Sequence, residues 1–214
     1  MESKMQKIMS TIKGMSYYKN HAAASGKVHN VAKHEDATED ILAHHGLNKS
    51  KLEKITKEKR DKWLKTRKTD EMENNTYICQ PCGKQNSPDF IVKINNKLHF
   101  LECKSVKGGS PMYNSGVPKA GYIYILCSEK HNETTLYLGE DVLPREEERL
   151  IQEHIQDQRQ KDEELNMLLG RSNSHGISYY TRPMIQHKGG KAKTDYFTHP
   201  KRKGLESNVL EVCR

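Results

Sequence analysis

The stretch NSPDFIVKINNKLHFLECKS, residues 86–105, decides how this chain is expected to fold. Runs of β-branched and other apolar residues flank Asn95-Asn96, and asparagine tolerates the positive φ that a two-residue hairpin turn requires. The stretch therefore predicts a β-hairpin with strands near residues 89–94 and 97–104. Its unusual feature is that both of these otherwise apolar strands carry charged side chains.

Counting outward from the turn gives the pairing of the two strands. Ile94 pairs with Lys97, and at the far end Asp89 falls opposite Glu102. Opposed residues on one face of an antiparallel pair have Cβ atoms about 4.5–5.5 Å apart. Lys104 projects from the same face as Glu102, because side chains alternate along a strand. The spacing predicts that three charged groups converge at one place.

Two carboxylates held this close repel each other and need a compensating charge. Mg²⁺ prefers oxygen ligands and commonly uses one or two protein carboxylates together with a substrate phosphate. Lys104 would then orient or help deprotonate the attacking water, while the metal stabilises charge on the phosphate. This combination predicts phosphodiester hydrolysis. The alternative interpretation is an ordinary ion cluster on the surface of an edge hairpin.

The same residues resemble a known motif. Pro88-Asp89, followed after twelve residues by Glu102-Cys103-Lys104, resembles the PD-(D/E)XK nuclease motif. The segments GKQNSPDF, LECKS and PMYNSGVPKAGYIYIL are similar to type II restriction endonucleases of that superfamily. The resemblance implies an α/β fold with a PD-(D/E)XK restriction-endonuclease-like core, in which helices flank a central mixed β-sheet. It also implies Mg²⁺-dependent, sequence-specific cleavage of double-stranded DNA that leaves 5′-phosphates, usually by a homodimer.

The resemblance assigns roles to individual residues. Asp89 and Glu102 would be metal ligands, and Lys104 would be the catalytic lysine. Cys103 falls within the metal site by its position in the motif, although strand alternation turns its side chain to the opposite face of the sheet. Family members often add a glutamate from a helix that precedes the sheet.

Residues 28–45, which are followed by Gly46, predict such a helix. Glu35 interrupts the otherwise apolar or small face of this helix and is therefore a candidate catalytic glutamate. Glu39, one turn later, competes for the same role. The alternative is that both are solvated acids on the helix surface.

The segment PMYNSGVPK, residues 111–119, follows the catalytic strand, where similar enzymes often place loops that contact the substrate. Asn114 and Ser115 are candidates for contacts to base edges or phosphate, and Lys119 for a contact to phosphate. A plain turn built on glycine and proline explains this segment equally well.

Residues 171–203 carry eight Lys or Arg and one Asp, interleaved with aromatic residues. Such a segment suits a loop that meets nucleic acid, and a disordered basic tail has the same composition. Arginine matches guanine and glutamine matches adenine by bidentate hydrogen bonding. By residue type, the candidate major-groove readers are Arg182, Gln186, His187 and Lys188.

We interpret residues 1–214 as a single endonuclease domain with a catalytic core at about residues 28–142. The expected core also contains strands near 121–127 and 134–138. A helix over about residues 144–169 has eight acids against four bases, so it is not expected to face DNA. A basic helix is predicted for residues 47–68, which contain ten Lys or Arg against three acids.

The formal charge of +8 and the pI of about 9.1 favour an anionic partner, of which nucleic acid is the commonest. No apolar run approaches the roughly 18 residues of a membrane span, and a secretory signal is not recognised. We therefore expect a soluble cytoplasmic protein without a membrane partner. Cys79 and Cys82 form CQPCG, half of a zinc-ribbon signature, but local packing is the favoured interpretation because no second CxxC follows.

Two other functions fit parts of this pattern. A repair or junction-resolving nuclease with the same core would recognise DNA shape rather than sequence. A non-catalytic basic DNA-binding protein would account for the charge alone. The complete set of Asp89, Glu102 and Lys104 argues against the latter, since a pure binder has no need for two adjacent carboxylates near phosphate.

Overall fold

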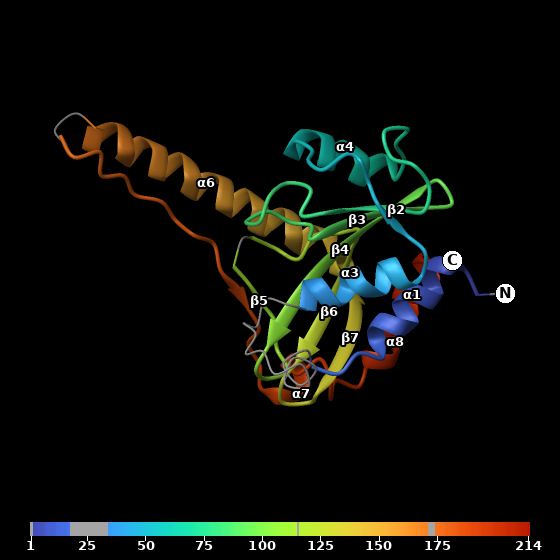
Figure 1. Ribbon diagram of the computed structural model, residues 1–214. Coiled ribbons are helices and arrows are strands. Elements are labelled where there is room, and N and C mark those ends of the chain that lie inside the picture. The colour runs from blue at the N-terminus through green and yellow to red at the C-terminus, as the bar shows by residue number, and fades with distance from the viewer. Residues whose placement is uncertain (1, 18–33, 115, 171–173) are drawn as a thin grey trace, which may run out of the picture.

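The computed structural model describes residues 2–17, 34–114, 116–170 and 174–214 (Figure 1). The described chain is an α/β structure whose centre is a mixed sheet of six strands in the order β1-β2-β3-β4-β6-β7. Neighbours β1–β2 and β4–β6 are parallel, and the other neighbours are antiparallel. The strands are β1 (Asn48–Lys49), β2 (Thr76–Cys79), β3 (Phe90–Ile94), β4 (Lys97–Val106), β6 (Tyr122–Ser128) and β7 (Glu133–Leu138).

Helices cover both faces of the sheet (Figure 1). On one face lie α1 (Lys4–Lys13), α3 (His34–His44) and α8 (Arg202–Val212), and on the other lies α4 (Lys57–Thr66). The short elements are α5 (Gly139–Val142), α7 (Lys191–Thr194), and the two-stranded sheet of β5 (Met112–Tyr113) and β8 (Ile185–Gln186). The expected class, helices flanking a central mixed sheet, is confirmed.

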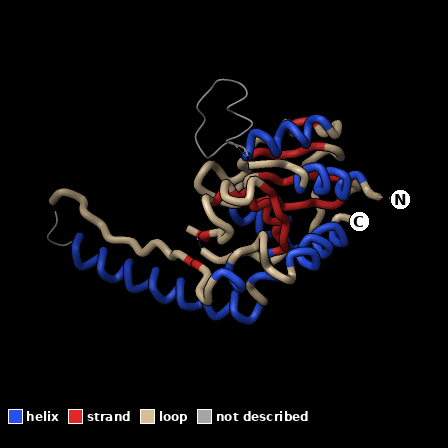
Figure 2. Tube along the Cα trace, turned by 90° about the horizontal axis from the view of Figure 1, so that it is seen from below, coloured by secondary structure: helices blue, strands red, loops and turns tan. Residues whose placement is uncertain are grey.

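The longest described helix, α6 (Arg145–Gly170), projects away from the body, and the chain after it runs back alongside it (Figures 1 and 2). The helix expected at residues 144–169 is thus confirmed. Ile155 is its only buried residue among those described. No helix in the described part of the chain has both the length and the apolar character needed to cross a membrane.

The hairpin at the centre of the sheet has the expected register. Ile94 pairs with Lys97 and Phe90 with Leu101, as counting from the turn predicted. Asn95 and Asn96 form the turn with φ of 50° and 59°. Both therefore have the left-handed conformation that matches the twist of the flanking strands.

The sheet is apolar on both sides because two hydrophobic layers enclose it. Phe90 and Leu101 point into the layer covered by α1, α3 and α8. Ile91 and Phe100 point into the opposite layer, which contains Trp63 of α4. Alternation along β3 and β4 therefore sends successive side chains into two different cores, and burial of both faces fixes the register.

Several elements differ from the sequence-based expectation. The helix predicted for residues 47–68 is helical only at Lys57–Thr66, because Asn48–Lys49 pairs with β2 as an edge strand. Helices α1 and α8, outside the expected core of 28–142, form part of one helical layer. The first residues of the helix expected at 28–45 lie outside the described residues.

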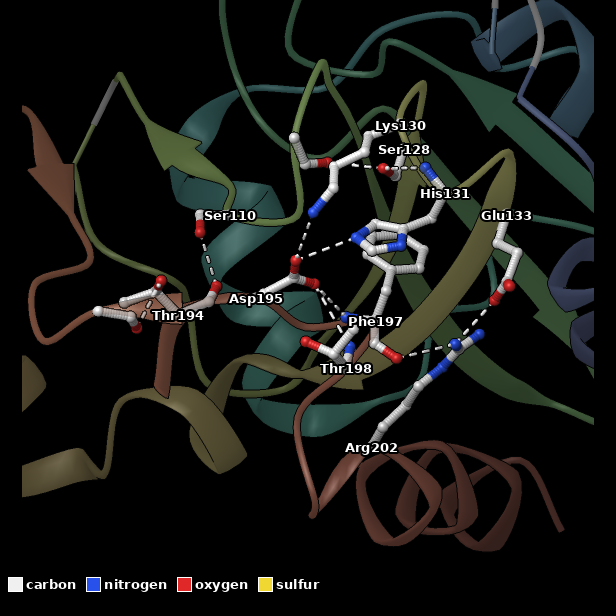
Figure 3. Close-up of polar contacts among 12 residues, drawn as sticks. Ser110, Ser128, Lys130, His131, Glu133, Thr194, Asp195, Phe197, Thr198 and Arg202 are labelled. Carbon is white, nitrogen blue, oxygen red and sulfur yellow. Dashed lines mark hydrogen bonds and ion pairs between the residues drawn. The ribbon is translucent and has the colours of Figure 1, made fainter. Parts of the chain in front are cut away.

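A buried carboxylate ties the C-terminal segment to the sheet (Figure 3). Asp195 accepts hydrogen bonds from the amides of Phe197 at 3.0 Å and Thr198 at 3.3 Å, and its Oδ2 lies 3.0 Å from His131 Nε2. A Cβ on Gly109 would lie only 2.2 Å from this carboxylate, so glycine is required there. Burial opposes ionisation, but these hydrogen bonds hold the pKa of Asp195 below its usual value. The chain after α7 is therefore fixed against the β6–β7 turn.

The turn geometry can be tested at Asn95. We expect Asn95→Val to lower the free energy of unfolding by about 1–2 kcal/mol, because a β-branched residue is strained in the left-handed region. Asn95→Gly is the matched control and should leave stability nearly unchanged, since glycine adopts positive φ without strain. Urea unfolding measures both, and equal stability of the two variants would contradict a left-handed turn.

Candidate active site

Asp89, Glu102 and Lys104 lie together at a cleft of about 810 Å³. Glu102 and Lys104 project from β4 on the same face, and Asp89 immediately precedes β3. The hairpin register brings the ends of these two strands side by side. The three charged residues that sequence spacing expected to converge therefore do line one cavity.

Main-chain hydrogen bonds hold Asp89 in place. Its N–H donates to the Leu101 carbonyl at 3.0 Å, and its carboxylate accepts the Cys103 N–H at 2.7 Å. The Gln80 N–H donates to the Asp89 carbonyl at 2.6 Å. The regular strand pairing ends at Phe90, so Asp89 meets β4 just beyond the ladder rather than as a regular cross-strand partner of Glu102.

Glu102 is buried, with 8% of its surface exposed. Its Oε1 accepts a hydrogen bond from Lys104 Nζ at 2.8 Å. Its Oε2 is buried and has no hydrogen-bond partner in the described structure. An unpartnered buried carboxylate oxygen is costly, since such groups are normally satisfied by hydrogen bonds, water or an ion.

The electrostatics of the site favour an added positive charge. Burial, followed by the charges of Glu102 and Glu35, raises the pKa of Asp89 to about 8. The amide of Cys103 and the charge of Lys104 act in the opposite direction but do not outweigh burial. The pocket thus disfavours a full set of ionised carboxylates unless a proton or a cation joins them.

The donor set fits a hard divalent cation. Carboxylate oxygens of Asp89 and Glu102 are the ligands that Mg²⁺ prefers, and it retains several waters when only one or two protein carboxylates bind it. The described residues contain no group of three or more His, Cys, Asp or Glu side chains placed to hold a metal. A metal here would therefore rely on two carboxylates, with the unpartnered Oε2 of Glu102 as one ligand atom.

The Cys103 side chain does not belong to this donor set. It is buried in the core on the other face of the sheet, as strand alternation predicted, and its Sγ lies 3.7 Å from Thr38 Oγ1. Burial raises the pKa of this thiol well above its usual value, which opposes the thiolate that a metal needs. What Cys103 contributes to the site is the main-chain N–H that holds Asp89.

The structure distinguishes the two helix glutamates. Glu35 lines the cleft, and its carboxylate accepts a hydrogen bond from Gln80 Nε2 at 2.8 Å. Glu39 is absent from the residues that line the cleft. Its carboxylate binds Lys49 Nζ and the Tyr77 hydroxyl, each at 3.1 Å. Glu35 is therefore the better candidate for the additional acid.

The candidate DNA-contacting residues fall into two groups. Asn114, Lys119 and Arg182 line the cleft. Gln186 and Lys188 are exposed but are not among its lining residues, and Ser115 lies outside the described residues.

His187 also lies away from the cleft. Its Nε2 is 3.0 Å from the Tyr196 hydroxyl, and burial lowers its pKa. This partly buried ring is engaged inside the protein and is poorly placed to read a base.

Lys119 occupies a defined position beside the acidic residues. Its N–H donates to the Tyr124 hydroxyl at 2.9 Å, and its ammonium lies 5.5 Å from the centre of the Tyr122 ring. Burial and the nearby charge of Arg60 lower the pKa of Lys119. Two tyrosines of β6 thus hold the main chain and the side chain of Lys119 at the cleft.

Some lining residues were not singled out from sequence. Lys84 follows the CQPCG segment, and Arg159 comes from α6, which its acidic composition had excluded from the DNA-facing surface. Tyr180 lies in the basic segment whose aromatic residues were noted in the sequence, but it was not named as a candidate. For Arg159 no local signal exists, because only the path of the helix past the cleft reveals it.

Cys79 and Cys82 are free thiols. Burial raises the pKa of both, that of Cys79 to about 11. Zinc sites require thiolates and a complete ligand set, and the part of the chain that the structure describes supplies no such set around these residues. Packing of the turn before β3 remains the interpretation of this pair.

Comparison with known proteins gives no relative. No protein-family model, no curated protein and no solved structure matches this chain. What is inferred about function therefore depends on the residues of the cleft.

The raised pKa of Asp89 predicts how stability changes with pH in the absence of metal. An unfolded aspartate titrates near 3.9, so between about pH 4 and pH 8 the folded state binds the proton more tightly and stability falls as pH rises. Asp89→Asn cannot ionise and keeps an oxygen for the Cys103 N–H. We expect this variant to be more stable than the wild type at pH 8 by about 1–3 kcal/mol.

Thermal unfolding in EDTA at pH 5 and pH 8 measures this difference. At pH 8, added Mg²⁺ should raise the midpoint of the wild type but not that of Asp89→Asn. If the unfolding midpoints of the two proteins changed with pH in the same way, the pKa of Asp89 would not be raised in the folded state.

Proposed function

We propose that this protein is a type II restriction endonuclease, which uses Mg²⁺ to hydrolyse phosphodiester bonds of double-stranded DNA at a specific sequence and leaves 5′-phosphates. The observation that carries the proposal is the buried, unpartnered Oε2 of Glu102 beside Asp89 and Lys104 in one cleft. A protein that only binds DNA gains nothing from two carboxylates at a phosphate site, because they repel the ligand.

The proposed roles follow from the positions of the side chains. Asp89 and Glu102 would hold Mg²⁺, which when bound supplies Lewis-acid stabilisation of the charge that develops on the phosphate. Lys104 orients the attacking water and places a positive charge near the phosphate in the transition state. Its contact with Glu102 Oε1 at 2.8 Å fixes the ammonium beside the metal ligands.

Cations around the acids support a polyanionic substrate. Lys84, Lys119, Arg159 and Arg182 line the cleft together with Lys104. Asn114, which also lines the cleft, presents an amide that can bind phosphate oxygens or base edges. The net charge of +8 favours DNA over neutral or cationic substrates.

A homodimer is part of the proposal, because two copies match the symmetry of a palindromic site. Apolar side chains exposed on the distal part of α6 and on the chain that returns from it support self-association. They are Leu165, Met167, Leu168 and Ile177, which are 40%, 64%, 59% and 67% exposed.

Cleavage assays with plasmid and phage DNA test the proposal directly. With Mg²⁺ we expect discrete fragments, and Lys104→Ala should reduce the rate by at least about 100-fold, as loss of a transition-state charge partner does. Binding of uncut DNA in a gel-shift assay should be largely retained. Lys107→Ala, an exposed lysine on the same segment but outside the cleft, is the matched control.

Undiminished cleavage by Lys104→Ala would refute the assigned role. Random nicking, or preference for branched DNA, would instead support a repair or junction-resolving nuclease. DNA binding with no cleavage under any divalent metal would support the non-catalytic reading.

The two helix glutamates can be compared in the same assay. Glu35→Gln should lower the cleavage rate by about 10- to 100-fold, the range seen when groups that support a metal site are removed. Glu39→Gln should stay close to the wild type, because Glu39 contacts Lys49 and Tyr77 instead of the cleft. The reverse order of effects would assign the additional acid to Glu39.

A further inference from the structure

The projecting element that leaves the body has a fixed internal structure. We call it the arm and define it as α6 together with residues 174–184, which run back along the helix (Figures 1 and 2). The Asn166 side chain both accepts the Tyr179 N–H at 2.6 Å and donates to its carbonyl at 2.7 Å. Asp162 accepts the N–H and the hydroxyl of Thr181. Hydrogen bonds from Asp162 and Asn166 therefore join the two halves of the arm.

Residues of the arm form one wall of the cleft that contains Asp89, Glu102 and Lys104. Arg159 of α6 and Tyr180 and Arg182 of the returning chain line this cavity. Arg182 Nε also donates to the Asn114 carbonyl at 2.8 Å, which links the arm to the loop on the body. Anything bound at the acidic residues thus meets both the body and the arm.

The chemistry of this wall differs from that of the rest of α6. Arg149, one of the other arginines of the helix, is paired with Glu146 and Glu153. Arg159 is exposed and has no ion pair or hydrogen bond with any described residue, although the helix is rich in acids. An unpaired guanidinium facing a cavity is suited to an anionic group, for which its planar fork of donors is pre-organised.

Tyr180 adds an apolar surface beside these guanidinium groups. Its side chain is 76% exposed, although it borders a cavity. Aromatic rings next to basic side chains are the usual combination where a protein holds a nucleic-acid strand, since the ring packs on a base and the cations contact phosphate.

We propose that Arg159, Tyr180 and Arg182 form a second DNA-binding wall, so that the strand to be cut is held between the body and the arm. Arg159 and Arg182 contact phosphates of this strand, and the Tyr180 ring packs on one of its nucleosides. The inference rests on the proposed function, because it specifies how the arm holds the DNA that the acidic residues would cut.

Binding of a labelled DNA duplex, measured without divalent metal over a series of salt concentrations, tests the wall. Loss of one phosphate contact lowers the slope of log K against log salt by about 1. We expect this change for Arg159→Ala, and an unchanged slope for Arg149→Ala, which removes an arginine from the same helix outside the cleft.

The tyrosine is tested with its neighbour as the control. Tyr180→Ala should weaken binding by about 5-fold or more without altering the salt slope, because stacking is not electrostatic. Tyr179→Ala should bind like the wild type, since Tyr179 does not line the cleft and is held through its main chain. All four positions are exposed, so the variants are expected to fold.

The outcomes separate this inference from the proposed function. If the wild type cleaves DNA with Mg²⁺ but Arg159→Ala and Tyr180→Ala bind like their controls, the wall is refuted and the nuclease proposal stands. If the arm variants change binding as expected but no cleavage occurs, the wall stands and the nuclease proposal fails. Absence of any DNA binding by the wild type would overturn both.

Discussion

The β3–β4 hairpin at the centre of the sheet holds two carboxylates close together where β3 begins, and the rest of the structure accommodates this constraint. The Cys103 amide binds the Asp89 carboxylate at 2.7 Å, so the strand that carries Glu102 also positions its acidic neighbour. Apolar layers on both faces of the hairpin prevent the strands from slipping to separate the charges. The acids therefore stay close together, and burial together with the neighbouring charges raises the pKa of Asp89.

The protein compensates this repulsion only in part. Lys104 neutralises one oxygen of Glu102, whereas the other oxygen has no partner among the described residues. Burial and the neighbouring acids raise the pKa of Asp89, so without a cation the site favours an additional proton. Buried polar groups without hydrogen-bond partners and groups with shifted pKa values occur most often at functional sites. Under the proposed function, a bound divalent cation would relieve this imbalance.

The C-terminal third of the chain completes the cleft from a distance. Asp195 fixes the segment after α7 to the β6–β7 turn (Figure 3), and the β5–β8 pairing joins the returning chain of the arm to the loop after β4. Arg159 of α6 and Arg182, which precedes β8, line the same cavity as Asp89. A helix that is acidic overall can in this way present one cation where an anionic ligand would bind.

The hairpin, its register and the face on which Glu102 and Lys104 lie could be predicted from the sequence, because these depend on turn chemistry and strand alternation over about twenty residues. It also placed Cys103 on the opposite face. The folded structure was needed to show that Glu35 and not Glu39 lines the cleft, that strand β1 replaces part of the expected basic helix, and that Arg159 reaches the cleft. These outcomes depend on contacts between segments far apart in the chain. Local periodicity and composition do not predict such contacts.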